Sequence, residues 1–348
     1  MVMARQRIAT PRTASMPFTI LYLRRIGSSC RSKRITIVSP WRRCVIQTDI
    51  GWSSKGMDKP ALILWALLGI AVVVAACLWA NRPRRVNIDA PLPAAFPEQG
   101  FSHDAFAGLL ETYVSADGRV DYQRWHDSRE HVAALDGYLA AVNAYSPDNT
   151  PERFPTRNDE LAYWMYGYNA WVIKGVLMNW PLTSVTDVKA PLEVVKGMGF
   201  FFQLRFPFGG EHMSLLRVEN EKIRKGFRDP RIHFVLNCAS ESCPVARPDL
   251  PTGEELQELL AAAAVEFVND SDNVFVDHKR RTVFLSTIFK WYKKDFVNHM
   301  VALGRPAKHG LLDYLGTVAQ EPLRDDLQQA TDYAIEFRDY DWGLNSKD

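Results

Sequence analysis

Two cysteines and a nearby histidine are the residues of this chain whose types and spacing best suit chemistry. Cys238 and Cys243 lie in a polar stretch that follows the apolar segment 231–237, which we predict to be a strand. In an oxidising compartment the two thiols would form a disulfide that closes a short loop. Alternatively, a thiolate with a histidine partner would act as a nucleophile. Both alternatives stay open from the residues alone.

A general base for Cys238 has several candidates. His233 belongs to the candidate set, but five residues of extended chain span about 16 Å and direct the two side chains to opposite faces, which disfavours a direct pair. A base from another segment is the better expectation, with His212, His278 and His299 available. A buried histidine with a structural partner is the alternative for His233.

The same scheme needs donors for an oxyanion and leaves little room for a metal. Backbone amides of residues 239–243, helped by Asn237 or Asn169, would hold the oxyanion. Zinc is disfavoured, because a four-residue gap between thiols is not the usual tight ligand pair and the chain has no second pair. We expect no cofactor.

A second segment with possible chemistry is the aromatic stretch 159–171. Helical spacing places its Tyr and Trp side chains on one wide face, a pattern that mostly indicates core. Asn169 within that face and Glu160 one turn before it are polar groups that could line a pocket. The candidate binding residues are Glu160, Tyr168, Arg231, Cys243 and Trp291.

Charge is distributed unevenly along the 348 residues. Eleven of the 42 Lys and Arg but only one of the 40 Asp and Glu lie in residues 1–56, which leaves 31 basic and 39 acidic residues after them. The body is therefore acidic, and an acidic body argues against nucleic acid as a partner. Residues 1–56 have the composition of a basic leader, and we hypothesise that the translated chain starts at Met57.

The segment 57–81 has the composition of a signal anchor. Its residues 61–80 read ALILWALLGIAVVVAACLWA, without a charge, and are long enough as a helix to cross a hydrocarbon layer of about 30 Å. We therefore expect a single membrane span. Lys59 before the span and the three arginines at 82–85 after it favour a cytoplasmic body by the positive-inside rule. Lipidation at Cys77, which follows small residues, is an alternative anchor.

The remaining chain predicts an α+β domain. Residues 82–100, rich in proline, are expected to be an extended linker, and the globular domain to span 101–348. The periodicities predict one mixed helical domain with a small antiparallel sheet. Helices are expected at 102–114, 128–143, 160–179, 214–225, 252–268 (capped by Thr252), 287–299, 308–318 and 324–335, and extended segments at 119–122, 200–208, 231–237, 273–276 and 282–285.

Four motifs in order resemble the family known as domain of unknown function 547. They are Ala162-Tyr163-Trp164 with Tyr168-Asn169-Ala170; Ser214-Leu215 with Val218-Glu219-Asn220 and Ile223-Arg224; Asp229 to Phe234 with Asn237-Cys238-Ala239-Ser240 and Ser242-Cys243-Pro244; and Leu285-Ser286 with Phe289-Lys290-Trp291-Tyr292 and Asp295-Phe296. The resemblance covers about residues 160–298. It implies bacterial relatives that are exported or attached to the envelope, which places the body on the periplasmic side of the inner membrane despite the arginine count. It implies no activity, and Asn220 stands where the pattern often has histidine.

Two functional hypotheses from different classes follow. The leading one is a thiol-dependent hydrolase or acyltransferase in which Cys238 attacks a carbonyl. The rival is a non-catalytic envelope binding module in which a Cys238–Cys243 bridge stiffens a recognition loop beside the aromatic helix. The partner in either case is the membrane together with an unidentified small molecule, peptide or envelope component.

Overall fold

The computed structural model describes residues 37–39, 42–44, 59–191, 193, 195–305 and 307–347. The chain divides into two units, residues 1–72 and 73–348. In the first unit, strands β1 (Ile37–Ser39) and β2 (Arg42–Cys44) pair antiparallel. Most of the basic leader 1–56, and the start hypothesised at Met57, lie outside the described residues.

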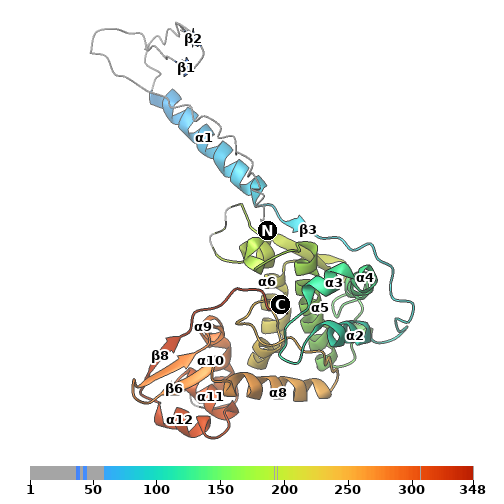
Figure 1. Ribbon diagram of the computed structural model, residues 1–348, viewed down its shortest axis with the longest axis vertical. Coiled ribbons are helices and arrows are strands. Elements are labelled where there is room, and N and C mark those ends of the chain that lie inside the picture. The colour runs from blue at the N-terminus through green and yellow to red at the C-terminus, as the bar shows by residue number, and fades with distance from the viewer. Residues whose placement is uncertain are drawn as a thin grey trace, which may run out of the picture. The chain divides into compact units, whose positions relative to one another are not determined.

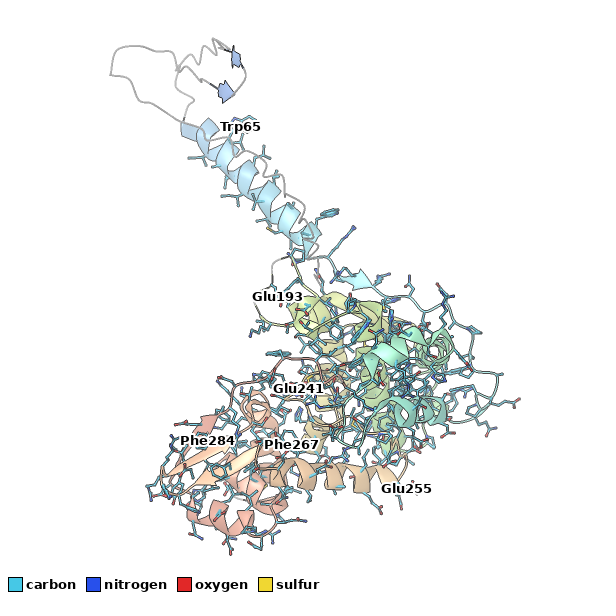
Figure 2. The ribbon with its side chains drawn as sticks, in the orientation of Figure 1. Trp65, Glu193, Glu241, Glu255, Phe267 and Phe284 are labelled. Atoms are coloured by element: carbon cyan, nitrogen blue, oxygen red, sulfur yellow. A yellow bond between two sulfur atoms is a disulfide. The ribbon has the colours of Figure 1, made fainter. Side chains whose placement is uncertain are left out.

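Helix α1 (Lys59–Ala80) contains the uninterrupted apolar segment. Within it, Ile63–Ala80 is long and apolar enough to cross a membrane, and no part of that window is buried against protein. Its large side chains, including Trp65, project from the helix (Figure 2), and Trp65 is 63% exposed. A helix with apolar side chains on every side and no protein covering is typical of a membrane span or a signal sequence.

The second unit is built around α5 (Arg157–Met178), which is buried along most of its length (Figure 1). The helix begins with a capping box, in which Thr156 accepts from the backbone N–H of Asp159 and Asp159 accepts from that of Thr156. Because neighbours cover it on several sides, its apolar residues are not confined to one stripe. The helices that contact it include α3 (Tyr122–Asp127), α4 (Arg129–Ala144), α6 (Leu215–Arg217) and α8 (Glu255–Asn269).

Two three-stranded sheets accompany the helices, and each contains one parallel pair. In the first, β4 (Leu204–Phe208) lies between β3 (Arg84–Arg85), to which it is parallel, and β5 (Glu211–Met213), to which it is antiparallel. In the second, β7 (Thr282–Leu285) pairs antiparallel with β6 (Val274–Asp277) and parallel with β8 (Ala334–Phe337). The predicted α+β class, a mixed helical domain with small sheets, is confirmed, and each sheet adds one parallel pair to its antiparallel pair.

The other helices are short. The α-helices among them are α2 (Asp104–Tyr113), α7 (Lys225–Phe227), α9 (Thr287–Trp291), α10 (Lys293–Ala302), α11 (Leu311–Val318) and α12 (Leu323–Gln329). Single 3-10 turns are η1 (Pro151–Arg153), η2 (Val185–Asp187) and η5 (Pro230–Phe234), and π-helical turns are η3 (Met198–Gln203) and η4 (Val218–Arg224). Figure 1 shows α9 to α12 gathered beside the sheet β6–β7–β8.

Several predicted elements are wrong for local reasons. The segment 231–237 is not a strand, because Pro230 opens the 3-10 helix η5 there, with Asp229 accepting from the backbone N–H of Arg231. Residues 119–122 provide only an isolated bridge at Val120 before α3 begins. The helix expected from 252 starts at Glu255 without a side-chain cap, so Thr252 forms no capping box. Residues 200–203 of the expected extended segment 200–208 belong instead to the helical turn at Met198–Gln203.

Residues 82–100 are more than a linker. Arg84 and Arg85 form β3, and the backbone N–H of Val86 donates to the carbonyl of Arg205 at 2.8 Å. Val86 itself is buried in the core. The segment is therefore held against the domain that follows it.

Candidate functional site

The loop after η5 contains the predicted thiols, and they are joined. Cys238 and Cys243 form a disulfide with a Cα–Cα distance of 6.1 Å. Ala239, next to Cys238, has a φ of 59°, so the loop turns through a left-handed residue that has a side chain. In this oxidised state Cys238 has no thiolate and cannot act as a nucleophile.

The amide side chains proposed as oxyanion donors hold this loop. Asn169 of α5 donates through Nδ2 to the carbonyl of Val235 at 3.0 Å and accepts from the backbone N–H of Asn237 at 2.9 Å. The Nδ2 of Asn237 donates to the carbonyl of Pro244 at 2.7 Å, and its Oδ1 accepts from the N–H of Ala239. Each amide thus uses both ends within the loop, which gives Asn169 and Asn237 a structural role.

The C-terminal segment completes the walls of the loop. The hydroxyl of Tyr340 lies 2.9 Å from Sγ of Cys238 and 2.9 Å from the hydroxyl of Ser240. The backbone N–H of Glu241 donates to the carbonyl of Gly343 at 2.8 Å. Burial raises the pKa of Tyr340, although its bond to Ser240 acts in the opposite direction, so the phenol is neutral at physiological pH.

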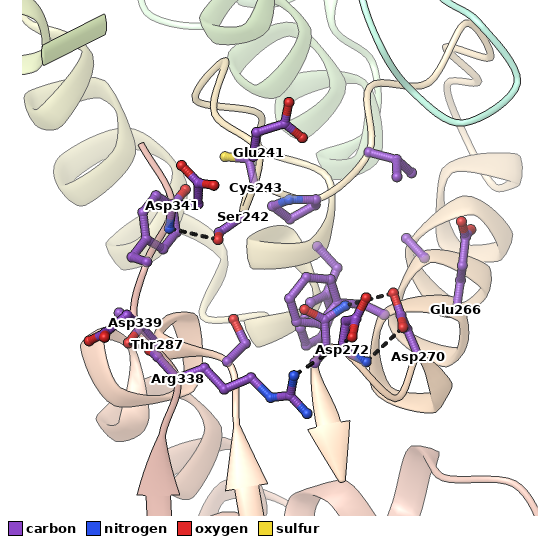
Figure 3. A pocket seen from close by; sticks show the side chains of 18 of the residues that line it. Glu241, Ser242, Cys243, Glu266, Asp270, Asp272, Thr287, Arg338, Asp339 and Asp341 are labelled. Atoms are coloured by element: carbon purple, nitrogen blue, oxygen red, sulfur yellow. Dashed lines mark hydrogen bonds and ion pairs between the residues drawn. The ribbon is translucent and has the colours of Figure 1, made fainter. Parts of the chain in front are cut away.

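A pocket of about 410 Å³ opens beside Cys243. Figure 3 shows carboxylates on both sides of it, with Asp339 and Asp341 on one and Asp270, Asp272 and Glu266 on the other. The hydroxyl of Ser242, in the same lining, accepts from the backbone N–H of Asp341 at 2.9 Å. The disulfide loop, α8 and the segment after β8 all contribute to its lining.

The pocket has an excess of negative charge. Its lining holds six carboxylates and two guanidinium groups. Arg247 pairs with Glu266, Arg338 lies 3.7 Å from Asp272, and Arg119 outside the lining pairs with Glu241. The carboxylates without a salt bridge to another described residue are Asp270, Asp339 and Asp341. The Nε atoms of Arg247 and Arg338 are buried without a hydrogen-bond partner among the described residues.

The predicted histidine bases lie elsewhere. Nε2 of His212, on β5, contacts the carbonyl of Val86 and Oδ1 of Asn87, and His278 contacts Tyr333 and Asp326. Within the described ranges, no histidine forms a hydrogen bond with Cys238 or Cys243. The thiol–histidine pair that a hydrolase requires is therefore not assembled in this structure.

His233 belongs to a buried ionic cluster that sequence reasoning missed. Its Nε2 lies 2.9 Å from Oδ2 of Asp295, and its ring stacks on Tyr292 with centroids 3.7 Å apart. Asp295 also accepts two hydrogen bonds from Arg224, at 2.7 and 3.0 Å. Burial alone would raise the pKa of Asp295, but the hydrogen bonds from His233 and Arg224 outweigh it and lower that pKa to about 2. Because a carboxylate only accepts, Nε2 of His233 must carry the proton.

Glu219 is a second acid near this cluster, and its electrostatic environment differs from that of Asp295. Burial raises its pKa, opposed by a hydrogen bond from Tyr292 and by the charge of Arg224. Burial also raises the pKa of Tyr168 and Tyr292, and the charge on Glu219 adds to both shifts. The pKa of His233 is lowered by burial, only partly offset by Asp295. The environments of the two acids, Glu219 and Asp295, therefore shift their pKa values in opposite directions.

The other predicted binding residues are placed apart from one another. Glu160 pairs with Arg157 at the start of α5. Arg231 pairs with Asp229 at 2.6 Å and donates to Gln257. Trp291 is 46% exposed and forms an aromatic group with Tyr340 and Trp342, with ring centroids 4.7 to 5.8 Å apart. The structure places only Cys243 in the lining of the acidic pocket, although Trp291 lies against Tyr340 of that lining.

Metal ligation finds no support in the described part of the chain. There, no group of three or more His, Cys, Asp or Glu side chains is arranged to hold an ion.

Residues 151–268, about one third of the chain, match the family described as "Protein of unknown function, DUF547". Over this segment the chain resembles that family. The matched segment contains the disulfide loop, Arg224 and His233. It ends before the hairpin β6–β7, so the motif around Trp291 and Asp295 lies outside it and the predicted extent of 160–298 is only partly confirmed. No curated protein and no solved structure matches the chain significantly.

Proposed function

We propose that this protein is a membrane-anchored, non-catalytic binding module of the bacterial cell envelope. The observation that carries the proposal is the disulfide between Cys238 and Cys243, which lies at the rim of the acidic pocket. A hydrolase or acyltransferase would need a free thiolate with a base within hydrogen-bond reach. The bridge removes the thiolate, and the hydrogen bonds of Asn169 and Asn237 use the amides that such an enzyme would need for the oxyanion.

Two features support a location at the bacterial inner membrane, namely the apolar helix and the oxidised state of the loop. A free-standing apolar helix such as α1 supports anchoring in a membrane. Disulfides persist in oxidising compartments such as the periplasm, so the bridge favours a body on the periplasmic side of the inner membrane. The arginines at 82–85 favour the opposite orientation, and we give the disulfide more weight because charge bias is one contribution among several to topology.

The ligand is proposed to present a positively charged amine. Three carboxylates of the pocket have no described salt-bridge partner, and the aromatic ring of Tyr340 lies in the same lining. Carboxylates and aromatic faces both attract ammonium groups. The rigid loop supports such recognition, because a site that is ordered before binding loses less conformational entropy when the ligand arrives.

The thiol state is tested by alkylation of the membrane-extracted full chain, with mass spectrometry scoring Cys238 and Cys243 separately. We expect both to be labelled only after reduction, and Cys238→Ser and Cys243→Ser to weaken ligand binding equally. Rapid labelling of Cys238 without reductant, well below its ordinary pKa of about 8.5, would overturn the proposal and restore the hydrolase.

The ligand class is tested by calorimetry with putrescine, a dication, and with glutarate, a dianion of similar length. Putrescine should bind the full chain in detergent, and Asp341→Asn and Asp339→Asn should each weaken binding several-fold. Asp249→Asn, an exposed carboxylate outside the pocket lining, is the matched control and should change nothing. Equal binding of the two probes, or no effect of the pocket variants, would contradict a cation site.

A further inference from the structure

A second pocket, of about 710 Å³, is lined by Arg224 and Asp295 of the ionic cluster of His233 and by Ile232 of η5. Its lining includes Asn220 and Arg224 of η4, Lys225 of α7, Arg228 after it, and Asp295 of α10. Three separate stretches of sequence therefore meet there. They are the stretches quoted above as Val218-Glu219-Asn220 with Ile223-Arg224, as Asp229 to Phe234, and as Asp295-Phe296.

The charge balance of this pocket is opposite to that of the acidic pocket. Both carboxylates of its lining are neutralised locally, Asp295 by Arg224 and Asp229 by Arg231. Lys225 and Arg228 also line it, and neither forms a salt bridge with another residue that the structure describes. The lining thus has two positive charges that no paired carboxylate offsets.

Arg224 adds a fixed hydrogen-bonding surface. Its Nε and Nη2 donate to Asp295, its Nη1 donates to Oδ1 of Asn220, and its guanidinium lies 5.0 Å from the centre of the Tyr292 ring. A guanidinium has five N–H donors, so two remain for a ligand. Because three partners already fix the orientation of this group, binding would cost little additional side-chain entropy.

Arg228 has a backbone conformation that is unfavourable for arginine. Helix α7 ends there, and the residue has a φ of 57°, the left-handed conformation that usually belongs to glycine at a helix C-terminus. A left-handed backbone is energetically unfavourable for a residue with a Cβ. The side chain is nevertheless present at the mouth of a pocket that has unbalanced positive charge, which is consistent with a role in binding.

Part of the lining of this pocket is apolar. Ile232, Val301 and Ala302 contribute to the lining, and Val301 is 61% exposed. An organic group attached to an anion would cover this surface and gain hydrophobic free energy. Inorganic phosphate alone would leave it uncovered.

From these observations we infer that the pocket lined by Arg224, Lys225 and Arg228 binds a phosphate monoester with a short apolar substituent. A phosphate monoester has a charge of about −1.5 to −2 at pH 7, which matches the two unbalanced cations, and its oxygens suit a guanidinium fork. A carboxylate would balance only one of them. This inference concerns a site distinct from the acidic pocket and does not depend on the function proposed for it.

The test is calorimetric titration of the full chain in detergent with butyl phosphate, butyrate and butylammonium. We expect butyl phosphate to bind at least tenfold more tightly than butyrate, and butylammonium not to bind at this pocket. Equal affinity for butyl phosphate and butyrate, or no binding of butyl phosphate, would overturn the inference.

Two variants and one control assign the binding to this pocket. Lys225→Met and Arg228→Gly should each weaken butyl phosphate binding about tenfold or more. Arg228→Gly is suited to the test because glycine accepts the left-handed backbone, so the variant should fold at least as stably as the parent. Lys294→Met removes an exposed charge of α10 that does not line the pocket, and should leave the affinity unchanged. Unchanged affinity in both pocket variants would place butyl phosphate elsewhere and refute the assignment.

The source of the phosphate group is resolved by competition with short-chain dihexanoyl phosphatidic acid, which has the same phosphate monoester on a lipid headgroup. If dihexanoyl phosphatidic acid displaces labelled butyl phosphate at a lower concentration than unlabelled butyl phosphate does, a lipid is supported as the natural ligand. Equal or weaker competition supports a soluble phosphate ester. Failure to compete at all would count against a phosphate monoester site.

Discussion

Asp295 accepts a hydrogen bond of 2.9 Å from Nε2 of His233, although 62 residues separate them in the chain. The bond joins α10 to η5, and Arg224 of η4 approaches the same carboxylate. Two helical turns and one helix are thus held together by a single charged group. The ionic cluster therefore holds η4, η5 and α10 together at the pocket lined by Arg224 and Asp295.

The first prediction concerns acid stability. The pKa of Asp295 is about 2 in the folded protein, against about 3.9 when unfolded. A lowered carboxylate pKa stabilises the fold above about pH 4, and this stabilisation is lost as the pH falls towards 2, amounting to about 2 kcal/mol. Asp295→Asn should therefore lower the free energy of unfolding at pH 7 by about that much and flatten its decline between pH 4 and 2, measured by urea unfolding.

His233 also makes the folded protein less stable as the pH falls, but at a higher pH than Asp295 does. Because burial lowers its pKa, the unfolded chain takes up a proton below about pH 6.5 that the folded chain does not, so stability falls as the pH drops through that value. Asp249→Asn provides a control outside the cluster. A pH profile that is the same for parent and Asp295→Asn would refute the assignment of this carboxylate.

The second prediction concerns the clamp that Asn169 forms on the disulfide loop. Asn169→Ala removes two hydrogen bonds and leaves the carbonyl of Val235 and the N–H of Asn237 without their partner. The expected cost is about 1–3 kcal/mol of unfolding free energy, together with weaker putrescine binding as the loop loosens. Asn179→Ala, which removes one hydrogen bond at the end of α5, is a milder comparison. If both variants were equally stable, Asn169 would not have the structural role described.

Elements with local signals could be predicted from sequence. Helix α4 begins after Ser128, whose side chain accepts from the N–H of His131, one residue from the predicted start. Helix α5 begins at Arg157, after the capping box of Thr156 and Asp159, three residues before the predicted start at 160. Both helices could be predicted because their patterns depend on residues close in sequence. The hairpin of β6 and β7 is likewise local. Strand β8 was missed because its partner β7 lies far away in sequence and its four residues have no distinctive alternation.

The candidate sites depend on long-range contacts and could be predicted only in part. The two cysteines were identified because their spacing allowed a bridge, one of the two alternatives left open. Tyr340, which contacts Cys238 across 102 residues, could not be found this way. Arg224 and Asp295 were each present in a quoted motif, but no sequence pattern indicates that two charges in different motifs will pair. The predicted strand at 231–237 also misplaced His233, because Pro230, directly before that segment, favours the first turn of a helix.

The third prediction concerns tight backbone packing at Gly199. A Cβ there would lie 2.0 Å from the carbonyl oxygen of Val188 and 2.7 Å from the N–H nitrogen of Ala190, both of which are backbone atoms. Gly199→Ala should therefore force η3 away from its neighbour and cost about 3 kcal/mol or more. Gly226→Ala is the matched control, because its Cβ meets nothing within 4 Å and alanine is the better helix former. Thermal unfolding should show the first variant destabilised and the second unchanged or slightly stabilised.

The fourth prediction tests the anchor and the orientation of the body. Deletion of residues 59–80 should move the protein from the membrane fraction to the soluble fraction, because no other described helix is apolar and long enough to span a bilayer. In intact spheroplasts of a bacterial host, added protease should digest the body of the full chain while a cytoplasmic marker protein survives. Protection of the body until the spheroplasts are lysed would place it in the cytoplasm, as the arginines at 82–85 favour, and the disulfide would then lack its oxidising compartment. A chain that stays with the membrane after the deletion would instead show that another part of the molecule binds the bilayer.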